Sequence, residues 1–258
     1  MGLRGNIWFA ALCAWFLLLT SCETIPEGER LIEIPLPEDT TGGAHLLIEY
    51  TGFRCVNCPK ASEAAQALKE MYGERLLVVS MHPESNPFTQ GKYDYTCEAA
   101  DIYYRYMGGT ATTPFPTGNI DLAQTNGNWF SDYSEWPTLL ARRMSEPAKV
   151  HMTAENGEIT FFADKEQTGR LVVWLVEDSV QGAQALPDGS VDLQYYHRHM
   201  LRGAIGNPWG EEITIGLLPT KYAVSWSVPE GCDPKRCRAV VIILNENKEL
   251  LNAIEMKE

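Results

Sequence analysis

The chain has few cations for its length. It carries 21 Lys and Arg residues against 34 Asp and Glu residues among 258, which gives a formal net charge of −13. A chain this acidic repels the phosphates of nucleic acids and the anionic headgroups of membranes. We therefore expect no nucleic-acid partner, and attachment to a membrane has to come from a lipid rather than from surface charge.

Long apolar runs, internal repeats and low-complexity tracts are also scarce. The one long apolar run, Ile7 to Leu19, follows Arg4 and leads into Thr20-Ser21-Cys22. It is too short for a comfortable membrane-spanning helix and has the form of an export leader. Small residues before a cysteine match the bacterial lipoprotein cleavage box, in which the Cys22 thiol is acylated. The alternative is an ordinary secretory leader, with Cys22 incidental.

The leader and a change of pattern near Pro147 define the expected organisation. We expect residues 1–21 to be a lipoprotein signal peptide and residues 22–44, rich in Pro, Glu, Thr and Gly, to be a tether from the lipid. The remaining length suits two domains, 45–147 and 148–258. An exported chain meets an oxidising compartment, so its thiols can form disulfides.

Strands and helices alternate in the first domain. Short apolar runs predict strands over 45–51 and 76–81 and after 114–116. Helical spacing of apolar residues predicts helices over 60–72, 95–107 and 132–144. This alternation indicates a mixed sheet with crossover connections.

The second domain shows short alternating runs without a helical period. They lie near residues 150–154, 158–163, 170–177, 191–199, 212–217, 222–228, 238–244 and 250–256. Asn156-Gly157 between the first two is a strong hairpin signal. About seven or eight short strands predict an Ig-like β-sandwich.

The first cysteine pair, Cys55 and Cys58, stands between a predicted strand and a predicted helix. A cysteine at a helix N-terminus has its thiolate stabilised by the helix dipole, and Arg54 adds a cation. The second cysteine can then resolve a mixed disulfide. The same spacing also suits a structural disulfide or half a zinc site.

Two further positions sharpen the redox interpretation. Glu49 stands six residues before Cys55, and Phe115-Pro116-Thr117 follows a Gly-rich turn. Here the chain resembles the thioredoxin-fold family, which implies a buried acid at Glu49 and a cis proline at Pro116 facing the disulfide. The alternatives are a solvent-facing Glu49 and a trans bond at Pro116. The Val-Asn pair inside the motif, the missing Trp before it and an insertion around 83–100 depart from that family.

More closely, the chain resembles a family of Bacteroides-type outer-membrane lipoproteins named after a 28 kDa outer membrane protein. The matching stretches are Ile25-Pro26-Glu27, Glu49 to Pro59, His82, and Tyr196 to Arg202. The resemblance implies a thioredoxin-like domain followed by a β-sandwich, on a lipid-anchored protein of the outer membrane.

The other cysteines have separate interpretations. Cys97 falls on a predicted helical face with Ala100 and Tyr104, as a buried inert thiol or as a third thiol that accepts the disulfide from Cys58. Cys232 and Cys237 flank a loop between two strands, where we expect a structural disulfide.

Histidines are few, and each leaves alternatives open. His82 ends a predicted strand and is a proton shuttle for Cys58, a copper ligand with Cys55 and Cys58, or a surface residue. His197 and His199 share a strand face, where packing is favoured over a zinc site. Asp178-Ser179-Val180 and Asp39-Thr40-Thr41 resemble the short O-glycan acceptor motif of Bacteroides-type exported proteins.

Three functions follow as hypotheses. The first is a lipid-anchored thiol–disulfide oxidoreductase, without a cofactor, that acts on exported or surface proteins with thiols or disulfides. The second is a surface binding protein or adhesin in which the Cys55–Cys58 pair is a staple. The third is a copper-binding protein.

Overall fold

The computed structural model describes residues 42–256. The predicted signal peptide, the lipidation position Cys22, most of the tether and the motif at Asp39 lie outside the described residues. The helices are α2 (Cys58–Tyr72), α3 (Glu98–Tyr106) and α4 (Trp136–Met144), with 3-10 turns at Gly73–Arg75 and Pro234–Arg236. The strands are β1 (His45–Tyr50), β2 (Leu76–Met81), β3 (Thr117–Ile120), β4 (His151–Glu155), β5 (Glu158–Phe162), β6 (Gln167–Glu177), β7 (Val180–Ala185), β8 (Val191–His197), β9 (Met200–Ala204), β10 (Glu211–Ile215), β11 (Thr220–Ala223), β12 (Cys237–Leu244) and β13 (Leu250–Met256).

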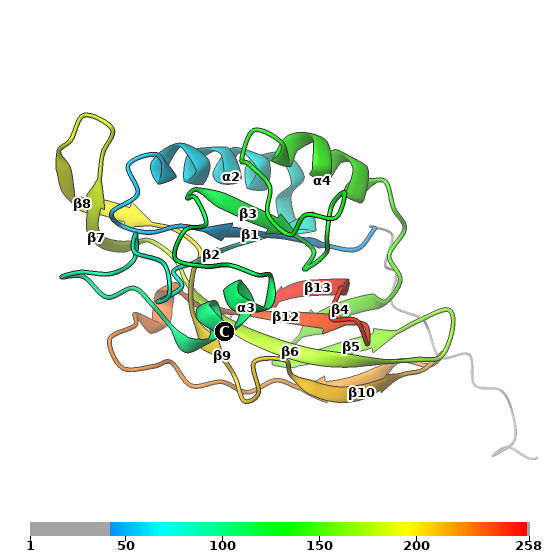
Figure 1. The fold of residues 1–258 in the computed structure, drawn as a ribbon. Coiled ribbons are helices and arrows are strands. Elements are labelled where there is room, and N and C mark those ends of the chain that lie inside the picture. The colour runs from blue at the N-terminus through cyan, green and yellow to red at the C-terminus, as the bar shows by residue number, and fades with distance from the viewer. Residues whose placement is uncertain (1–41, 257–258) are drawn as a thin grey trace, which may run out of the picture. The chain divides into compact units, whose positions relative to one another are not determined.

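One mixed sheet runs through most of these strands (Figure 1). Its order is β13-β12-β6-β9-β2-β1-β3, and β10 adds to β6, which makes eight strands. β1 and β2 pair in parallel, with Leu47 opposite Val78, and β2 pairs in parallel with β9. Two smaller sheets, β11-β5-β4 and the hairpin β7-β8, complete the described part of the chain.

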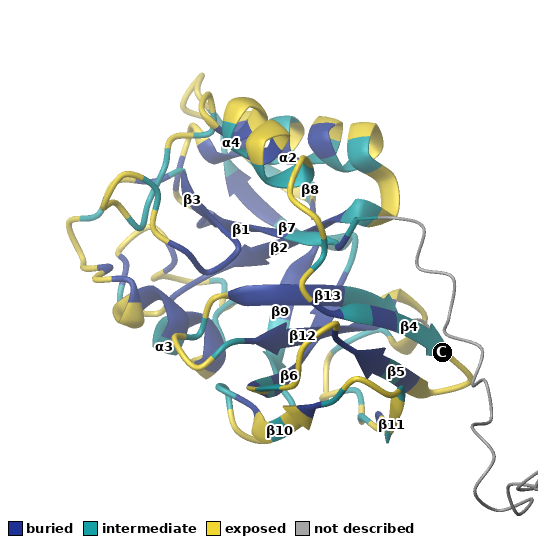
Figure 2. Cartoon of the chain, turned by 90° about the vertical axis from the view of Figure 1, so that its right-hand side faces the viewer, coloured by how far each residue is buried: buried dark blue, intermediate teal, exposed yellow. Residues whose placement is uncertain are grey.

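Alternation along the strands divides the core between the two faces of the sheet. Leu46 and Ile48 of β1, with Val172 and Trp174 of β6, belong to one apolar cluster, which includes residues of α3. Leu47 of β1 points the other way and packs with α2 and α4. Figure 1 shows α2 and α4 on one side of β1 to β3 and α3 on the other. Figure 2 shows how completely the central strands are buried.

The predicted fold class, a thioredoxin-like α/β domain followed by an Ig-like β-sandwich, is wrong. Ser80 of β2 pairs with Met200 of β9, so strands from both predicted domains belong to one sheet. The physical reason is that β6 and β12 are buried on both faces. Strands that are apolar on both faces occupy the middle of a sheet and need cover on each side. One face shares its core with β1 and β2, and the other is covered by β4 and β5.

Several local predictions are confirmed. β2 has the predicted bounds, and α2 begins two residues earlier than predicted and ends at the predicted residue. Asn156 and Gly157 both have positive φ, 52° and 78°, in the turn between β4 and β5. That pair of conformations defines the tight hairpin turn that Asn-Gly favours. Among residues 42–256, no helix is long and apolar enough to cross a bilayer.

Candidate functional site

The Cys55–Cys58 disulfide lies where β1 ends and α2 begins. The two sulfurs are bonded, with Cα atoms 5.4 Å apart, and the Cys58 amide donates to the Cys55 carbonyl at 3.2 Å. Pro59 stands in the first turn of α2, where a missing N–H costs nothing. The Asn57 side chain does not cap the helix, and in the first turn the amides of Cys58 and Lys60 donate to the loop carbonyls of Cys55 and Asn57.

Both sulfurs are more buried than an exposed redox pair would be. Cys55 is 2% exposed and Cys58 is 1% exposed. The redox interpretation requires a pair that a partner thiol can reach, and the burial comes from segments that lie over the loop. The surroundings of the disulfide therefore decide what can reach it.

Glu49 of β1 is a buried acid, as the resemblance implied. Its side chain is 1% exposed, and its Oε2 accepts a hydrogen bond from the Ser80 hydroxyl at 2.9 Å. Its Oε1 has no partner among the described residues. Burial raises the pKa of Glu49 to about 7, and the Ser80 hydrogen bond opposes that rise. A carboxyl with such a pKa can give or take a proton near neutral pH.

Glu49 and Cys58 share one small cavity. Its volume is about 10 Å³, which is about enough for one water molecule. Its other lining residues include Ser80, His82, Gln184 and His197. The acid is thus placed on the Cys58 side of the disulfide, where the resolving sulfur would exchange a proton.

His82 is buried, so its interpretation as a surface residue is wrong. It is 2% exposed, neither ring nitrogen has a partner within the described chain, and its ring lies 5.7 Å from that of His197. Burial lowers the pKa of His82 well below its usual value and that of His197 to about 4. Both imidazoles are therefore neutral at pH 7. His197 Nε2 bonds to the carbonyl of Ala183 at 3.1 Å.

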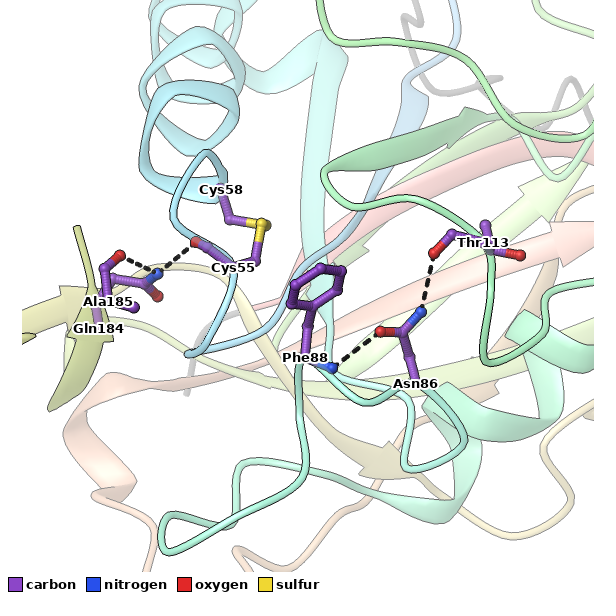
Figure 3. Close-up of a disulfide and its surroundings, with 7 residues drawn as sticks. All are labelled: Cys55, Cys58, Asn86, Phe88, Thr113, Gln184 and Ala185. Carbon is purple, nitrogen blue, oxygen red and sulfur yellow. Dashed lines mark hydrogen bonds between the residues drawn. A yellow bond between two sulfur atoms is a disulfide. The ribbon is translucent and has the colours of Figure 1, made fainter. Parts of the chain in front are cut away.

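The predicted insertion forms a cover over the disulfide. In this segment, Pro83–Tyr95, the carbonyl of Phe88 accepts a hydrogen bond from the Arg54 amide at 3.1 Å. Figure 3 shows the Phe88 ring beside the Cys55–Cys58 bond. The ring stacks on Phe115 with centroids 5.9 Å apart. The Phe115–Pro116 peptide bond is cis, as the resemblance implied.

The β7–β8 hairpin supplies a second wall. The Gln184 side-chain amide donates to the carbonyl of Cys55 at 2.9 Å (Figure 3). The backbone amide of Ala185 donates to the carbonyl of Phe53 at 2.7 Å. Sequence patterns did not identify Gln184, because β7 has almost no alternation of apolar and polar residues that would predict a strand. It also missed Phe88 and Asn86, although the extra length before Pro116 marked their segment.

Cys97 lies away from the helical face on which it was expected. α3 begins at Glu98, so Cys97 is the residue before the helix, and its thiol donates to the carbonyl of Leu201 in β9 at 3.5 Å. Burial raises the pKa of Cys97, which suits an inert thiol.

Cys232 and Cys237 are free thiols in the structure, so the expected disulfide between them is not formed. The 3-10 turn Pro234–Arg236 stands between them. The Arg202 guanidinium donates to the Cys232 sulfur at 3.0 Å and lies 3.3 Å from the Glu177 carboxylate. The Arg202–Glu177 ion pair therefore lies against the Cys232 thiol.

His197 and His199 do not share a face. His199 follows β8 with a φ of 54°, and its ring lies between Arg238, at 2.8 Å, and Gln66, at 3.2 Å. Asp178 and Ser179 lie in the adjacent turn, where Asp178 accepts the His199 amide. Within residues 42–256, no group of three or more His, Cys, Asp or Glu side chains is arranged to hold a metal ion. The candidate set of His82 with Cys55 and Cys58 is therefore not a formed site.

Two solved structures show the same type of fold. HBP35 of Porphyromonas gingivalis aligns with 84% of this chain and 76% of its own, at 14% identity and a TM-score of 0.58. A structural-genomics protein from Agrobacterium tumefaciens aligns with 83% of this chain and 93% of its own, at 13% identity and a TM-score of 0.53. At such identities the likeness concerns the fold alone.

The family assignment comes from the sequence. A domain of the outer membrane lipoprotein Omp28 from P. gingivalis covers 43% of this chain and 88% of the domain at 18% identity, with a TM-score of 0.24 that is too low to indicate a shared fold. None of the curated proteins compared with the chain matches it. The model of the family "Outer membrane protein Omp28" matches residues 100–257, more than half of the sequence. The chain therefore belongs to the family described as outer membrane protein Omp28.

Proposed function

We propose that this lipoprotein exchanges disulfides with exported partner proteins through Cys55 and Cys58, while acylated Cys22 anchors it to the membrane. The observation that carries the proposal is Glu49. A buried carboxyl with an unpartnered oxygen and a pKa of about 7 destabilises the fold when it ionises. A disulfide that served only as a staple would gain nothing from such a group beside Cys58.

The roles follow from position. A partner thiolate attacks the Cys55 sulfur, the Cys55–Cys58 bond breaks, and Cys58 leaves as a thiolate that takes the Glu49 proton. A second partner thiol then attacks the partner's own sulfur in the mixed disulfide and releases Cys55 as a thiolate. Two electrons pass from the partner to the protein, and the partner leaves with a disulfide. Reduction of a partner disulfide is the same sequence in reverse.

The test uses the mature protein without its lipid. Wild type should oxidise dithiol peptides or reduce insulin disulfides, and Cys55→Ser should do neither. Cys58→Ser should accumulate a mixed disulfide on Cys55, because the resolving thiol is missing. An absence of both activities in wild type contradicts the proposal.

Burial of both sulfurs favours a second candidate, a surface binding protein in which the disulfide is a staple. The reduction potential separates the two candidates. Structural disulfides lie below roughly −300 mV, whereas exchanging ones lie nearer the glutathione range. A value in the lower range assigns the pair to structure.

A further inference from the structure

We propose that the Phe88 side chain is a displaceable cover over the Cys55–Cys58 disulfide and controls how fast a thiol reaches Cys55. It occupies the place that an apolar side chain of the partner takes during exchange. The proposal rests on the exchange reaction proposed above and adds the class of partner. It predicts partners whose reacting cysteine is flanked by a large apolar residue.

The backbone of the cover is packed directly on the loop that carries the disulfide. A Cβ atom on Gly52 would lie 2.5 Å from the Phe88 carbonyl oxygen, a distance that real Cβ atoms do not show. The Arg54 amide donates to that same oxygen. The contact is made by the main chain on both sides, so it resembles the way an added peptide segment is held.

Asn86 fixes the position of this backbone. It is fully buried, and its Nδ2 donates to the Tyr104 hydroxyl at 3.0 Å. The same Nδ2 donates to the Thr113 carbonyl at 3.1 Å (Figure 3). Its Oδ1 accepts the Phe88 amide at 3.1 Å. A buried amide with these bonds holds one conformation, because leaving any of the groups unpaired is costly.

The Phe88 side chain is held less firmly than its backbone. It is 36% exposed, whereas Asn86 beneath it is 0% exposed. Its ring lies against Phe115, which is 8% exposed, and beside the disulfide. Rotation of one side chain would therefore uncover the sulfurs while the pinned backbone stays in place.

Rotation of Phe88 away from the disulfide also exposes the Phe115 ring. Burial of that ring against another apolar side chain is then favourable. A partner that places a large apolar side chain on Phe115 restores the lost contact as its cysteine reaches Cys55. A small thiol cannot restore it. This difference gives the site a preference among partners that the two cysteines alone do not provide.

The first experiment measures access in the lipid-free mature protein. Dithiothreitol reduces the Cys55–Cys58 bond through a mixed disulfide and leaves as its cyclic disulfide. Phe88→Ala should raise the rate constant of this reduction about tenfold, because access limits the attack. Tyr106→Ala is the matched control, since Tyr106 is 37% exposed and packs against Trp129 and Trp209 instead. It should leave the rate unchanged.

The second measurement separates access from a change in the bond itself. A cover alters forward and reverse rates by the same factor, so the reduction potential of Phe88→Ala against glutathione should equal that of wild type. Phe88→Leu, which keeps an apolar side chain, should react at an intermediate rate and guards against misfolding of the alanine variant. Equal reduction rates in wild type and Phe88→Ala, or a faster rate with a shifted potential, overturns the cover. Failure of every variant to exchange overturns the proposed function instead.

The third measurement tests the partner class. Two peptide disulfides are compared, one with Phe and one with Ser beside the reacting cysteine. Wild type should react several-fold faster with the Phe peptide, and Phe115→Ala should lose the preference while it still reacts with dithiothreitol. Equal rates for the two peptides in wild type overturn the assignment of apolar partners.

Discussion

Two close cysteine pairs meet different surroundings in this protein. Cys55 and Cys58 are bonded at the start of a 15-residue helix, above a buried carboxyl whose one hydrogen bond is from Ser80. Cys232 and Cys237 are free and flank a 3-10 turn of three residues. Sequence spacing alone treats both as candidate disulfides.

The nearby glutamates explain much of the difference. Within residues 42–256, Glu49 has no cation in its hydrogen-bonding shell, and its pKa of about 7 would let it carry a proton for Cys58 in the proposed exchange. Glu177 is bound by the Asp233 amide at 2.8 Å and faces Arg202. Burial first, and then the Glu177 charge, raises the pKa of Cys237 to about 11, which disfavours its reactive thiolate. In the proposed exchange, the difference in reactivity between the two pairs would follow from charge and helix geometry rather than from the distance between two cysteines.

The largest effect should come from removing one sulfur of the first pair. Cys55→Ser should lower disulfide exchange at least about 100-fold, because within residues 42–256 no other thiol lies both at a helix start and beside a buried acid. Cys237→Ser should leave the exchange rate within about twofold of wild type. Both rates are measured with the same dithiol peptide.

The contrast between the pairs fails if Cys237→Ser loses activity as strongly as Cys55→Ser. That result would mean that the second pair accepts electrons from the first. A double variant, Cys232→Ser with Cys237→Ser, checks whether the pair acts as a unit.

Glu49→Gln should change how stability depends on pH. The folded pKa of about 7 lies above the usual glutamate pKa of 4.5, so the folded state binds the proton more tightly than the unfolded chain. The raised pKa of Glu49 therefore stabilises the wild-type fold in full below pH 4.5, and this stabilisation is lost as the pH rises through 7. The difference corresponds to about 3 kcal/mol. Urea denaturation at several pH values measures it.

The buried histidines act in the opposite direction and have to be subtracted. Burial lowers the folded pKa of His197 to about 4 and lowers that of His82, so their contribution is present above pH 6.5 and is lost as the pH falls. They are present in both proteins, so the difference between wild type and Glu49→Gln isolates the carboxyl. Parallel stability curves for the two proteins would show that Glu49 ionises normally.

Local features of this fold were predictable, whereas its assembly was not. Apolar runs located β1 and β2, Asn156-Gly157 located a hairpin, and the position of Glu49 before Cys55 indicated the buried acid. The runs in β6 and β12 were counted as sandwich strands, although burial on both faces marks central strands of a larger sheet. Pairing of β2 with β9 joins residues 120 positions apart at Ser80 and Met200, and no local pattern encodes such a contact.

The site was predictable to the same extent. Cys55, Cys58 and Glu49 could be placed because they belong to one short motif and its flank, and Pro116 because of the resemblance to the thioredoxin-fold family. Phe88 reaches the disulfide only because Asn86 is held by groups that follow it in the chain, at Tyr104 and Thr113. Gln184 reaches Cys55 from a hairpin 129 residues away. Such contributions depend on tertiary packing, which single-sequence patterns do not report.

Gly52→Ala should disturb the Cys55–Cys58 pair by displacing the backbone of Phe88, which covers it. The new methyl group would overlap the Phe88 carbonyl, which cannot move freely because it belongs to the backbone. We expect a loss of about 1–3 kcal/mol in the free energy of unfolding, together with faster reduction of the disulfide. Gly216→Ala is the control, because a Cβ there would lie 3.9 Å from the Leu218 amide nitrogen, which is an ordinary van der Waals contact. Unchanged stability in Gly52→Ala would mean that the cover is not packed on the loop.

The smallest effect should come from the carboxylate beside the second pair. Glu177→Gln removes one of the charges that raise the pKa of Cys237, while burial, the larger cause, persists. Alkylation of Cys237 by iodoacetamide at pH 8.5 should therefore become only about two- to threefold faster, because the thiolate fraction increases with each fall in pKa. Glu158→Gln, an exposed change on β5, should leave the rate unchanged. Mass spectrometry of the labelled peptide measures both rates. If Cys237 in the Glu177→Gln protein reacted as fast as reduced Cys55, the Glu177 charge alone would account for the difference in thiol reactivity between the two pairs. The helix start and burial together would then not be its cause.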